Sequence, residues 1–185
     1  MIKRYSTPET DALFSEVDKM SRWLEIELCV VEELATAGIV PKDAAAACRA
    51  NAPVIDEAFV ARVEEREVIT NHDVAAFVDV VQQAIGAPHG TWIHYGLTSS
   101  DVVDTALCKV LTDAMDIVIT EVRAFRDALT ARAVESIDWP ITGRTHGMHA
   151  EPTTFGAKFA LFALQANRDL ERVENARRAI AVGKL

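Results

Sequence analysis

The chain has 185 residues, of which half are hydrophobic and a quarter are charged, so it can bury a core and is not a disordered tail. Its net charge of −9 argues against broad nucleic-acid binding, which needs a basic face. An anionic small substrate is still compatible, because a few cations and helix N-termini can create a locally positive pocket. Charges interrupt every apolar run before membrane-spanning length, and no apolar segment follows a basic start. We therefore expect a cytoplasmic protein without membrane partners.

The three cysteines, Cys29, Cys48 and Cys108, are scattered and form no C-x-x-C motif. Two of them lie in apolar helical patterns. We expect buried thiols in a reducing compartment.

The first part of the chain reads as a series of helices. Thr7–Glu9 predicts a helix start, with a capping threonine, a proline at the first helical position and an acid near the positive end of the helix dipole. Apolar residues recur at helical spacing from Leu13 onward, and Gly38 marks the end of this long helix. A shorter alanine-rich helix follows over residues 41–50, and after a break another runs through Phe59.

Two further helix starts carry polar side chains. Residues 70–73, Thr-Asn-His-Asp, have the spacing of a capping box and predict a helix that ends before Gly86. A non-helical stretch then leads to Thr98, Ser99 and Ser100, which are suited to cap the following helix.

The second part of the chain is dominated by two long helices. From Asp101 to Pro140 there is no internal proline or glycine, and one apolar face predicts a helix of roughly thirty residues, typical of bundles. The stretch GRTHGMHAEPTTFG, residues 143–156, interrupts this pattern with three glycines, and we expect it to present His146 at a helix start. The next helix is expected from Pro152. Its expected inward side chains are Phe155, Phe159, Phe162, Ala166, Val173 and Ile180.

No segment reads as a β-strand, so the predicted fold class is all-α. We expect a small N-terminal helical domain over residues 1–97, followed over residues 98–185 by the first long helices of a central helical bundle. Two long helices alone expose an apolar stripe that needs partners. The chain stops directly after a helix, which indicates an incomplete bundle or one built to associate.

Four polar clusters lie at the start of the chain or of a predicted helix, where unpaired N–H groups favour anions. They are Arg4-Tyr5-Ser6, Asn71-His72-Asp73, Thr98-Ser99-Ser100, and Thr145-His146 with His149. Each alone has an ordinary structural interpretation as a cap or a surface group, and His89 is interpreted as a surface residue. No Cys, Asp or Glu completes a metal-ligand spacing around His146 and His149, so no metal is expected. Together, the clusters favour a site for an anionic substrate.

Three motifs, RYSTPE, HYGLTSSD and GRTHGMHAEPTTFG, closely resemble the adenylosuccinate lyase family of the fumarase/aspartase superfamily, and the resemblance runs from Arg4 to the last residue. It implies an all-α homotetramer in purine biosynthesis, with each active site built from three subunits. The implied reaction is β-elimination of fumarate from adenylosuccinate, giving AMP, and from the succinyl-aminoimidazole-carboxamide ribotide. The partners implied are therefore small molecules, with no cofactor.

The same resemblance assigns roles to residues of this chain. His146, in the Thr-His pair with Thr145, matches the catalytic acid. The matching substrate-binding positions are Arg4 and Tyr5 for the nucleotide phosphate, Asn71, His72 and Asp73 for the substrate, Thr98 and Ser99 for the succinyl carboxylates, and His94 as a further active-site histidine.

One part of the family pattern is missing. The family's base is a serine in a downstream Ser-Ser-x-Met-Pro-x-Lys loop, and these 185 residues contain no such motif. The resemblance thus covers the N-terminal portion of such an enzyme, and we expect the chain alone to be inactive. Two alternatives stay open: another superfamily member such as carboxymuconate cycloisomerase, and a non-catalytic helical binding or oligomerisation module.

Overall fold

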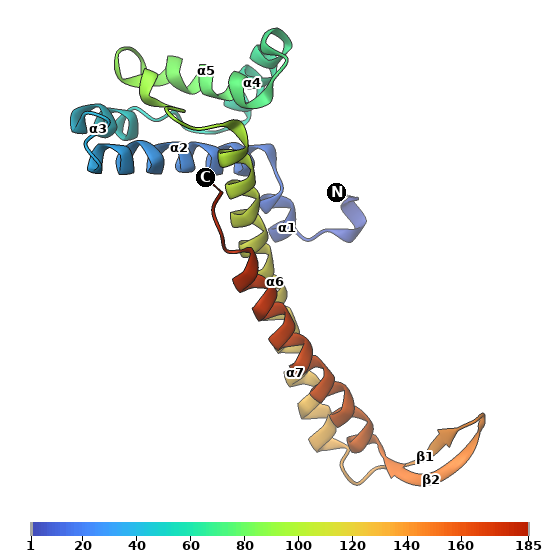
Figure 1. Ribbon diagram of the computed structural model, residues 1–185. Coiled ribbons are helices and arrows are strands. Elements are labelled where there is room, and N and C mark those ends of the chain that lie inside the picture. Colours follow the sequence, from blue (N-terminus) through green and yellow to red (C-terminus); the bar gives the residue numbers. More distant parts are fainter. Residues whose placement is uncertain (1, 185) are drawn as a thin grey trace. The chain divides into compact units, whose positions relative to one another are not determined.

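A computed structural model describes residues 2–184 and is built almost entirely of helices (Figure 1). The predicted all-α class is confirmed, with one short hairpin as the exception. The elements in chain order are η1 (Lys3–Tyr5), α1 (Pro8–Leu13), α2 (Glu16–Thr36), α3 (Lys42–Ala50), α4 (Glu57–Thr70), α5 (Asp73–Ile85), η2 (His89–Trp92), α6 (Ser99–Glu135), β1 (Pro140–Thr145), β2 (Met148–Thr154) and α7 (Phe155–Ile180).

The chain divides into two compact units. The first comprises the described residues up to Val110 together with those from Val182, and the second runs from Leu111 to Ala181. The division falls within α6 and reflects packing inside this chain. The domain boundary after residue 97 stays a prediction.

The prediction of one long helix from Thr7 is wrong, because the chain breaks at Phe14 into two helices, α1 and α2. Thr7 opens α1 with a capping box in which its hydroxyl accepts from the Thr10 N–H. Ser15 then caps α2, since its Oγ accepts from the Asp18 N–H at 3.1 Å. A serine that satisfies a helix N-terminus competes with continuation of the preceding helix, and the apolar period alone does not reveal this competition.

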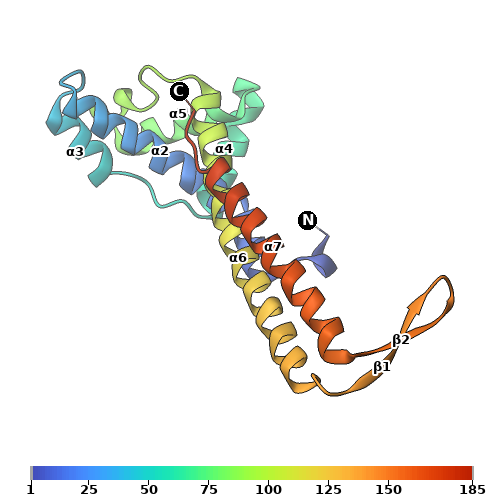
Figure 2. The same ribbon diagram turned by 60° about the horizontal axis from the view of Figure 1, so that its bottom comes forward.

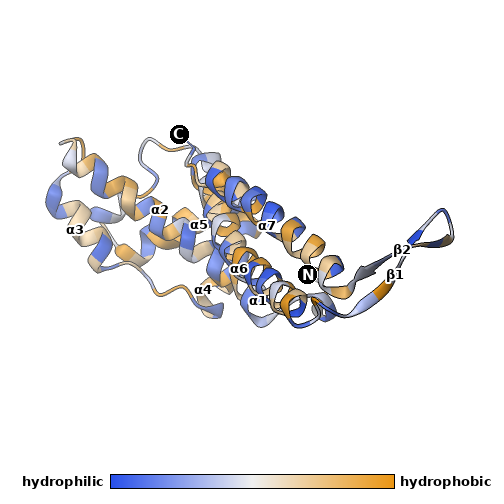
Figure 3. Ribbon diagram, turned by 90° about the horizontal axis from the view of Figure 1, so that it is seen from below, coloured by the Kyte–Doolittle hydropathy of each residue, from blue (hydrophilic) through white to orange (hydrophobic). Residues whose placement is uncertain are grey.

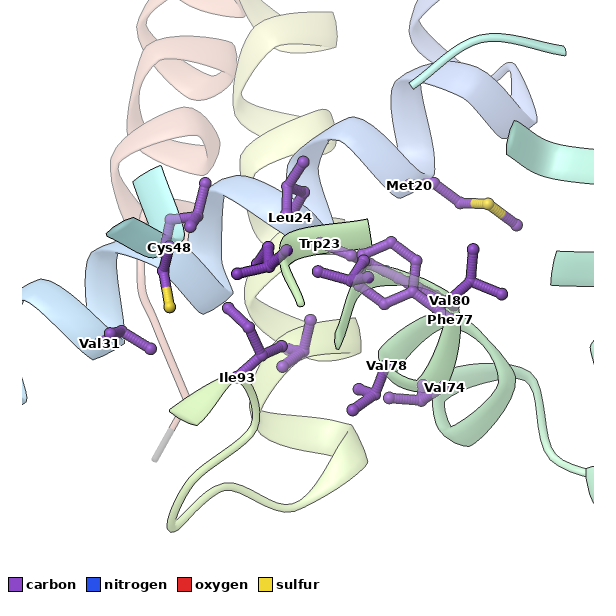
Figure 4. Packing of buried hydrophobic residues seen from close by; sticks show 14 of the residues in the cluster. Met20, Trp23, Leu24, Val31, Cys48, Val74, Phe77, Val78, Val80 and Ile93 are labelled. Atoms are coloured by element: carbon purple, nitrogen blue, oxygen red, sulfur yellow. The ribbon is translucent and has the colours of Figure 1, made fainter. Parts of the chain in front are cut away.

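The core of the first unit lies among α2, α3, α4, α5 and the start of α6 (Figure 4). Trp23 and Phe59 both meet Phe77 edge to face, with ring centroids 5.4 and 6.1 Å apart. These three aromatic residues are at most 3% exposed. Burial of such a side chain contributes about 1.5–3 kcal/mol. This core supports the helix starts that carry Asn71-His72-Asp73 and Thr98-Ser99-Ser100.

The expected capping box at residues 70–73 does not form. Thr70 is the last residue of α4, and Asn71 adopts a left-handed conformation with φ 50° that ends the helix. His72 is the cap of α5. Asparagine tolerates positive φ better than most residues, which explains why the break falls there rather than before Thr70.

The stretch between the long helices forms a β-hairpin, which the sequence interpretation missed. β1 and β2 pair antiparallel, and the register Thr145↔Met148 leaves His146 and Gly147 as a two-residue loop. His146 is therefore at a hairpin tip, and its expected place at a helix start is wrong. Pro152 sits within β2, where a two-stranded ribbon leaves one edge free of ladder bonds.

α7 begins at Phe155, later than expected, because Thr154 is its cap and accepts from the Ala157 N–H at 3.1 Å. α6 is 37 residues long, against the roughly thirty expected from its apolar face. Within the second unit, the C-terminal part of α6 and α7 run side by side in both views (Figures 1 and 2). Arg177 pairs with Asp116 across them at 2.5 Å.

The inward face expected for α7 is only partly buried. Its buried residues are Gly156, Ala163, Ala166 and Leu170, and apolar residues recur along the rest of the helix (Figure 3). Phe155 and Phe162 are 38% and 44% exposed, so these 185 residues alone do not cover the face expected to be inward. The helical spacing of apolar residues correctly predicted an apolar stripe on α7, but within this unit α6 covers only part of that stripe.

The expectation of buried thiols holds for one cysteine and fails for another. Cys48 is fully buried, Cys108 is intermediate and Cys29 is exposed. The Cys29 thiol donates to Glu25 on the polar side of α2. No helix among residues 2–184 combines the length and apolarity needed to cross a membrane.

Candidate active site

Arg4 and Tyr5 form the short 3-10 turn η1 near the start of the chain, and both are exposed. The Arg4 guanidinium carbon lies 4.8 Å from the centre of the Tyr5 ring, a cation–π contact. The turn thus presents a planar cation with two parallel donors, the geometry that suits a phosphate.

His72 is held at the junction of α4 and α5 by the helix that it caps. Its Nδ1 accepts from the Ala75 N–H at 3.4 Å, which requires that Nδ1 carry no proton. In the neutral ring the proton is then on Nε2, which lies 3.4 Å from the Ser99 hydroxyl. The cap therefore fixes His72 as a donor through Nε2 and directs it at the start of α6.

Asp73 lies beside the same imidazole but is engaged with the helix. Its Oδ1 accepts from the Val74 N–H at 2.8 Å and is 3.3 Å from His72 Nδ1. The second distance is an ion pair only if Nδ1 is protonated, and the cap bond to Ala75 opposes that. The Asp73 carboxylate therefore also stabilises the α5 N-terminus, where the helix dipole favours an acid.

Asp101 and Thr98 are joined by two reciprocal hydrogen bonds at the start of α6. The Thr98 N–H donates to Asp101 Oδ2 at 2.8 Å, and the Asp101 N–H donates back to the Thr98 carbonyl at 2.9 Å. The Thr98 bond, helped by the Lys184 ammonium at 2.9 Å, lowers the pKa of Asp101. Lys184 also donates to the Ser100 hydroxyl at 2.8 Å. The turn offers hydroxyls and first-turn N–H groups, which suit a carboxylate.

His94 has left-handed backbone geometry, with φ 68°, and is held from the interior by Glu27. Glu27 Oε2 accepts from the His94 backbone N–H at 2.7 Å, and Glu27 Oε1 lies 2.6 Å from His94 Nδ1. Burial raises the pKa of Glu27, while the bonds from His94 act in the opposite direction. Sequence reasoning missed Glu27. Its signal was a carboxylate among inward-facing positions of α2, between Trp23 and Leu28.

In the second unit, the β1–β2 hairpin carries Thr145 and His146, both exposed. His146 and Gly147 have positive φ, at 51° and 72°, so the tip holds the imidazole by turn geometry. His149 pairs with Arg144 in the hairpin register. The hairpin presents His146 to solvent within its unit.

A pocket of about 760 Å³ lies at the base of this hairpin and the start of α7. Arg144 and Lys158 line it together with apolar side chains such as Phe155 and Leu161. At Gly143 a Cβ would lie 2.6 Å from the Glu151 carbonyl oxygen, so the two strands approach there as only glycine allows. The two cations suit an anionic group.

The expected site residues thus fall into separate groups. The structure brings His72 to Ser99 and Asp101 to Thr98, and His94 is among the groups that lower the pKa of Asp101. Arg4 and Tyr5 contact each other. Among residues 2–184, no three His, Cys, Asp or Glu side chains gather as metal ligands.

Comparisons with known proteins give the family. A family model described as lyase matches residues 4–185. Adenylosuccinate lyase from Bacillus subtilis (strain 168) is 42% identical over 185 residues, which is all of this chain and 42% of the relative. Adenylosuccinate lyase from Deinococcus radiodurans is 42% identical over 184 residues, covering 98% of this chain and 42% of the relative. The chain therefore spans about two-fifths of the length of these curated relatives.

Solved structures are similar over the same extent. Fumarate lyase from Mesorhizobium sp. BNC1 has a TM-score of 0.87 and 30% identity, covering 96% of this chain and 41% of that one. The 3-carboxy-cis,cis-muconate lactonizing enzyme from Pseudomonas putida has a TM-score of 0.85 and 27% identity, covering 98% and 42%. With the family model matched from Arg4 onward, the chain belongs to the lyase family.

Proposed function

We propose that this chain is the N-terminal part of an adenylosuccinate lyase, which eliminates fumarate from adenylosuccinate to leave AMP and acts likewise on the succinyl-aminoimidazole-carboxamide ribotide. Similarity to proteins of that name over the whole chain supports this proposal. The observation that carries it is the meeting of His72 Nε2 and Ser99 Oγ, 3.4 Å apart, at the start of α6. Donors converge there on the kind of position that binds a carboxylate.

The elimination removes a proton from a carbon beside a carboxylate and leaves a carbanion whose charge spreads into that carboxylate. Donors fixed at the carboxylate stabilise this transition state more than the ground state. In the proposal, Thr98 and Ser99 hold the succinyl carboxylates, and His72 with Asn71 and Asp73 completes the binding surface. Their preorganisation by caps means that little reorganisation is needed during reaction.

The leaving nitrogen must gain a proton, and His146 is proposed as the acid, with Thr145 beside it. A histidine titrates near neutrality, so it can hold a proton and release it. Arg4 and Tyr5 are proposed to bind the nucleotide phosphate. His94 is proposed as a further active-site histidine.

The proposed enzyme is a cytoplasmic homotetramer that acts on small molecules without a metal or organic cofactor. The exposed apolar residues of α6 and α7, Phe125 and Phe162 among them, support association with further helices. In the resemblance the base is a serine of a Ser-Ser-x-Met-Pro-x-Lys loop, which these 185 residues do not contain. We therefore expect no turnover by the 185-residue chain alone.

The test is an assay of the full-length gene product with adenylosuccinate, detecting AMP and fumarate separately. Equal release of the two products is the expected result. The competing activity is that of the lactonizing enzyme whose structure the chain resembles. If the protein converted 3-carboxy-cis,cis-muconate and left adenylosuccinate intact, the proposed lyase function would be wrong and the lactonizing activity would replace it.

The role of His146 is tested by His146→Ala in the same protein. Loss of a positioned proton donor is expected to lower kcat by about 10²–10⁴-fold. His149→Ala is the matched control, because His149 lies on the same exposed hairpin without a proposed role. A His146→Ala enzyme that keeps kcat within tenfold of wild type would exclude the acid role.

A further inference from the structure

Glu27 is a carboxylate with no exposed surface, placed on the apolar side of α2. Leu24, Leu28 and Val31, its neighbours on that side of the helix, are all buried. An ionised carboxylate in such surroundings is costly unless charged or polar groups satisfy it. Both of its oxygens are satisfied by one residue, His94, which is 67 positions away in sequence.

The two bonds differ in what they require of His94. The backbone N–H at Oε2 is a permanent donor, so this oxygen must accept. An ionised carboxylate has only acceptors, so Nδ1, at 2.6 Å from Oε1, must carry a proton. The hydrogen bond at one ring nitrogen decides the state of the other. In the neutral ring of His94, the nitrogen without a proton is then Nε2.

Hydrogen bonds to the residues on either side of His94 also hold this segment in place. The Gln82 side-chain amide donates to the Ile93 carbonyl at 3.0 Å. The Leu97 N–H donates to the His94 carbonyl at 3.4 Å, which leads directly into Thr98 at the start of α6. The His94 side chain is 22% exposed, so the ring is accessible from outside while its Nδ1 is bonded within.

We infer that Glu27 is a positioning residue for His94, which it holds at the entrance to α6 as the Nδ1–H form, so that the ring meets the substrate through Nε2. This inference rests on the proposed function, in which His94 lies in the active site. Glu27 itself is too deeply buried to touch a substrate. Besides Glu27, Asp101 at the start of α6 interacts electrostatically with His94, and Lys184 is the ion-pair partner of Asp101.

Glu27→Gln separates this role from simple packing, because glutamine has the same shape. Its side chain has one acceptor oxygen and one donor NH₂, whereas wild type supplies two acceptors. The His94 backbone N–H needs the oxygen, which leaves the NH₂ facing the ring. The ring must then present a bare Nδ1 and carry its proton on Nε2. The substitution is expected to reverse the tautomer of His94.

The first measurement is long-range ¹H–¹⁵N NMR of the 185-residue chain with ¹⁵N-labelled histidine, with the His94 signals assigned by their loss in His94→Asn. Wild type is expected to show a protonated Nδ1 in the neutral ring, and Glu27→Gln a protonated Nε2. A wild-type ring protonated at Nε2 would overturn the inference, since a neutral carboxyl would then be the donor to Nδ1. This outcome does not require Glu27→Gln to fold, because it is read from the wild-type ring.

The second measurement is kcat of the full-length gene product with adenylosuccinate. A histidine held in the wrong tautomer can cost up to about 10⁴-fold, and we expect at least a tenfold loss in Glu27→Gln. Glu25→Gln is the matched control, because it removes an exposed carboxylate from the same helix, and we expect its kcat to stay within twofold. A reversed tautomer with unchanged kcat would exclude the positioning role.

The two proposals can fail separately. If the wild-type product does not convert adenylosuccinate, the proposed function fails, whereas the NMR result still reports on the bond between Glu27 and His94. If the wild type is active and Glu27→Gln keeps both its tautomer and its kcat, the proposed function survives and the role of Glu27 is refuted.

Discussion

The two units use the same kind of amphipathic helix with opposite results. In the first unit, Phe59 and Phe77 have no exposed surface. In the second, Phe125 and Phe162 are 61% and 44% exposed, although they also lie on helices that carry apolar stripes. Periodicity identifies which face of a helix is apolar, but only the surrounding elements decide whether that face is covered.

The polar residues differ between the units in a parallel way. His94 is fixed by a buried carboxylate, and His72 by the helix that it caps. His146 is placed by the two-residue turn at the tip of its hairpin. His94 and His72 are thus oriented by specific hydrogen bonds, whereas His146 is placed by the backbone conformation of its turn.

The largest expected effect comes from truncating equivalent aromatic residues in the two units. Phe77→Ala leaves a cavity in a packed core and is expected to lower the free energy of unfolding by about 3–5 kcal/mol. Phe162→Ala removes a side chain already close to half exposed, and should cost less than about 1 kcal/mol in the 185-residue chain. Urea unfolding followed by far-UV circular dichroism measures both. Equal losses of unfolding free energy in the two variants would contradict the difference in burial between the two units.

A smaller effect is expected where the second unit is tightly packed, at the junction of the hairpin and α7. A Cβ at Gly156 would lie 2.5 Å from the Ile137 Cα and 2.8 Å from the Ala133 carbonyl oxygen. Gly156→Ala should therefore destabilise by about 1–3 kcal/mol, the usual cost of overpacking. Hydrogen exchange of peptides covering residues 133–160 should reveal the loss locally.

The control for this substitution is Gly183→Ala, where an added Cβ would meet only the Thr105 side chain, at 3.7 Å. That distance is an ordinary contact, so no loss of protection is expected. If Gly156→Ala were as neutral as its control, the close approach at this junction would be wrong.

The smallest expected effect concerns the surface of α2 and depends on pH. Hydrogen bonds from Arg49 lower the pKa of Glu25 and of Glu32 below their usual 4.5. Carboxyls with a lowered pKa in the folded state add stability above pH 4.5, and this contribution is lost as the pH falls through the lowered values. Because solvent screens these groups, Arg49→Met should cost only about 1 kcal/mol or less at neutral pH.

Urea unfolding between pH 7 and pH 3 measures this effect, and the gap between wild type and Arg49→Met should narrow below pH 4.5. Arg172→Met, which breaks a single exposed pair with Asp169, is the control and should lie within about 0.5 kcal/mol of wild type throughout. A constant gap across the pH range would show that Arg49 acts through packing.

The sequence predicts the helices of this chain well because their signals are local. Pro8 and Gly38 bound helical segments as expected, and α6 starts where its hydroxyl run predicts. The hairpin was missed because its residues alternate weakly, and because Pro152 is unusual in a strand. The break at Phe14 was missed because Ser15 competes as a cap only once the chain turns there.

The candidate site shows the same limit. Its polar residues stand out along the chain as clusters, and the resemblance to a lyase family is carried by short motifs. The bond between Glu27 and His94 joins positions 67 apart, and no local pattern pairs them. Tautomers are likewise invisible in sequence, since they depend on which partner each ring nitrogen meets.

The positive φ of His146 sets folding against chemistry at one position. A two-residue hairpin loop of this kind is filled most comfortably by asparagine followed by glycine, and a histidine there bears a backbone cost of about 1–2 kcal/mol. A redesign guided by stability alone would therefore choose His146→Asn and would obtain a more robust protein. If His146 is the catalytic acid, as proposed, the His146→Asn enzyme would lack it. Selecting variants of this turn for stability alone would then yield inactive enzymes.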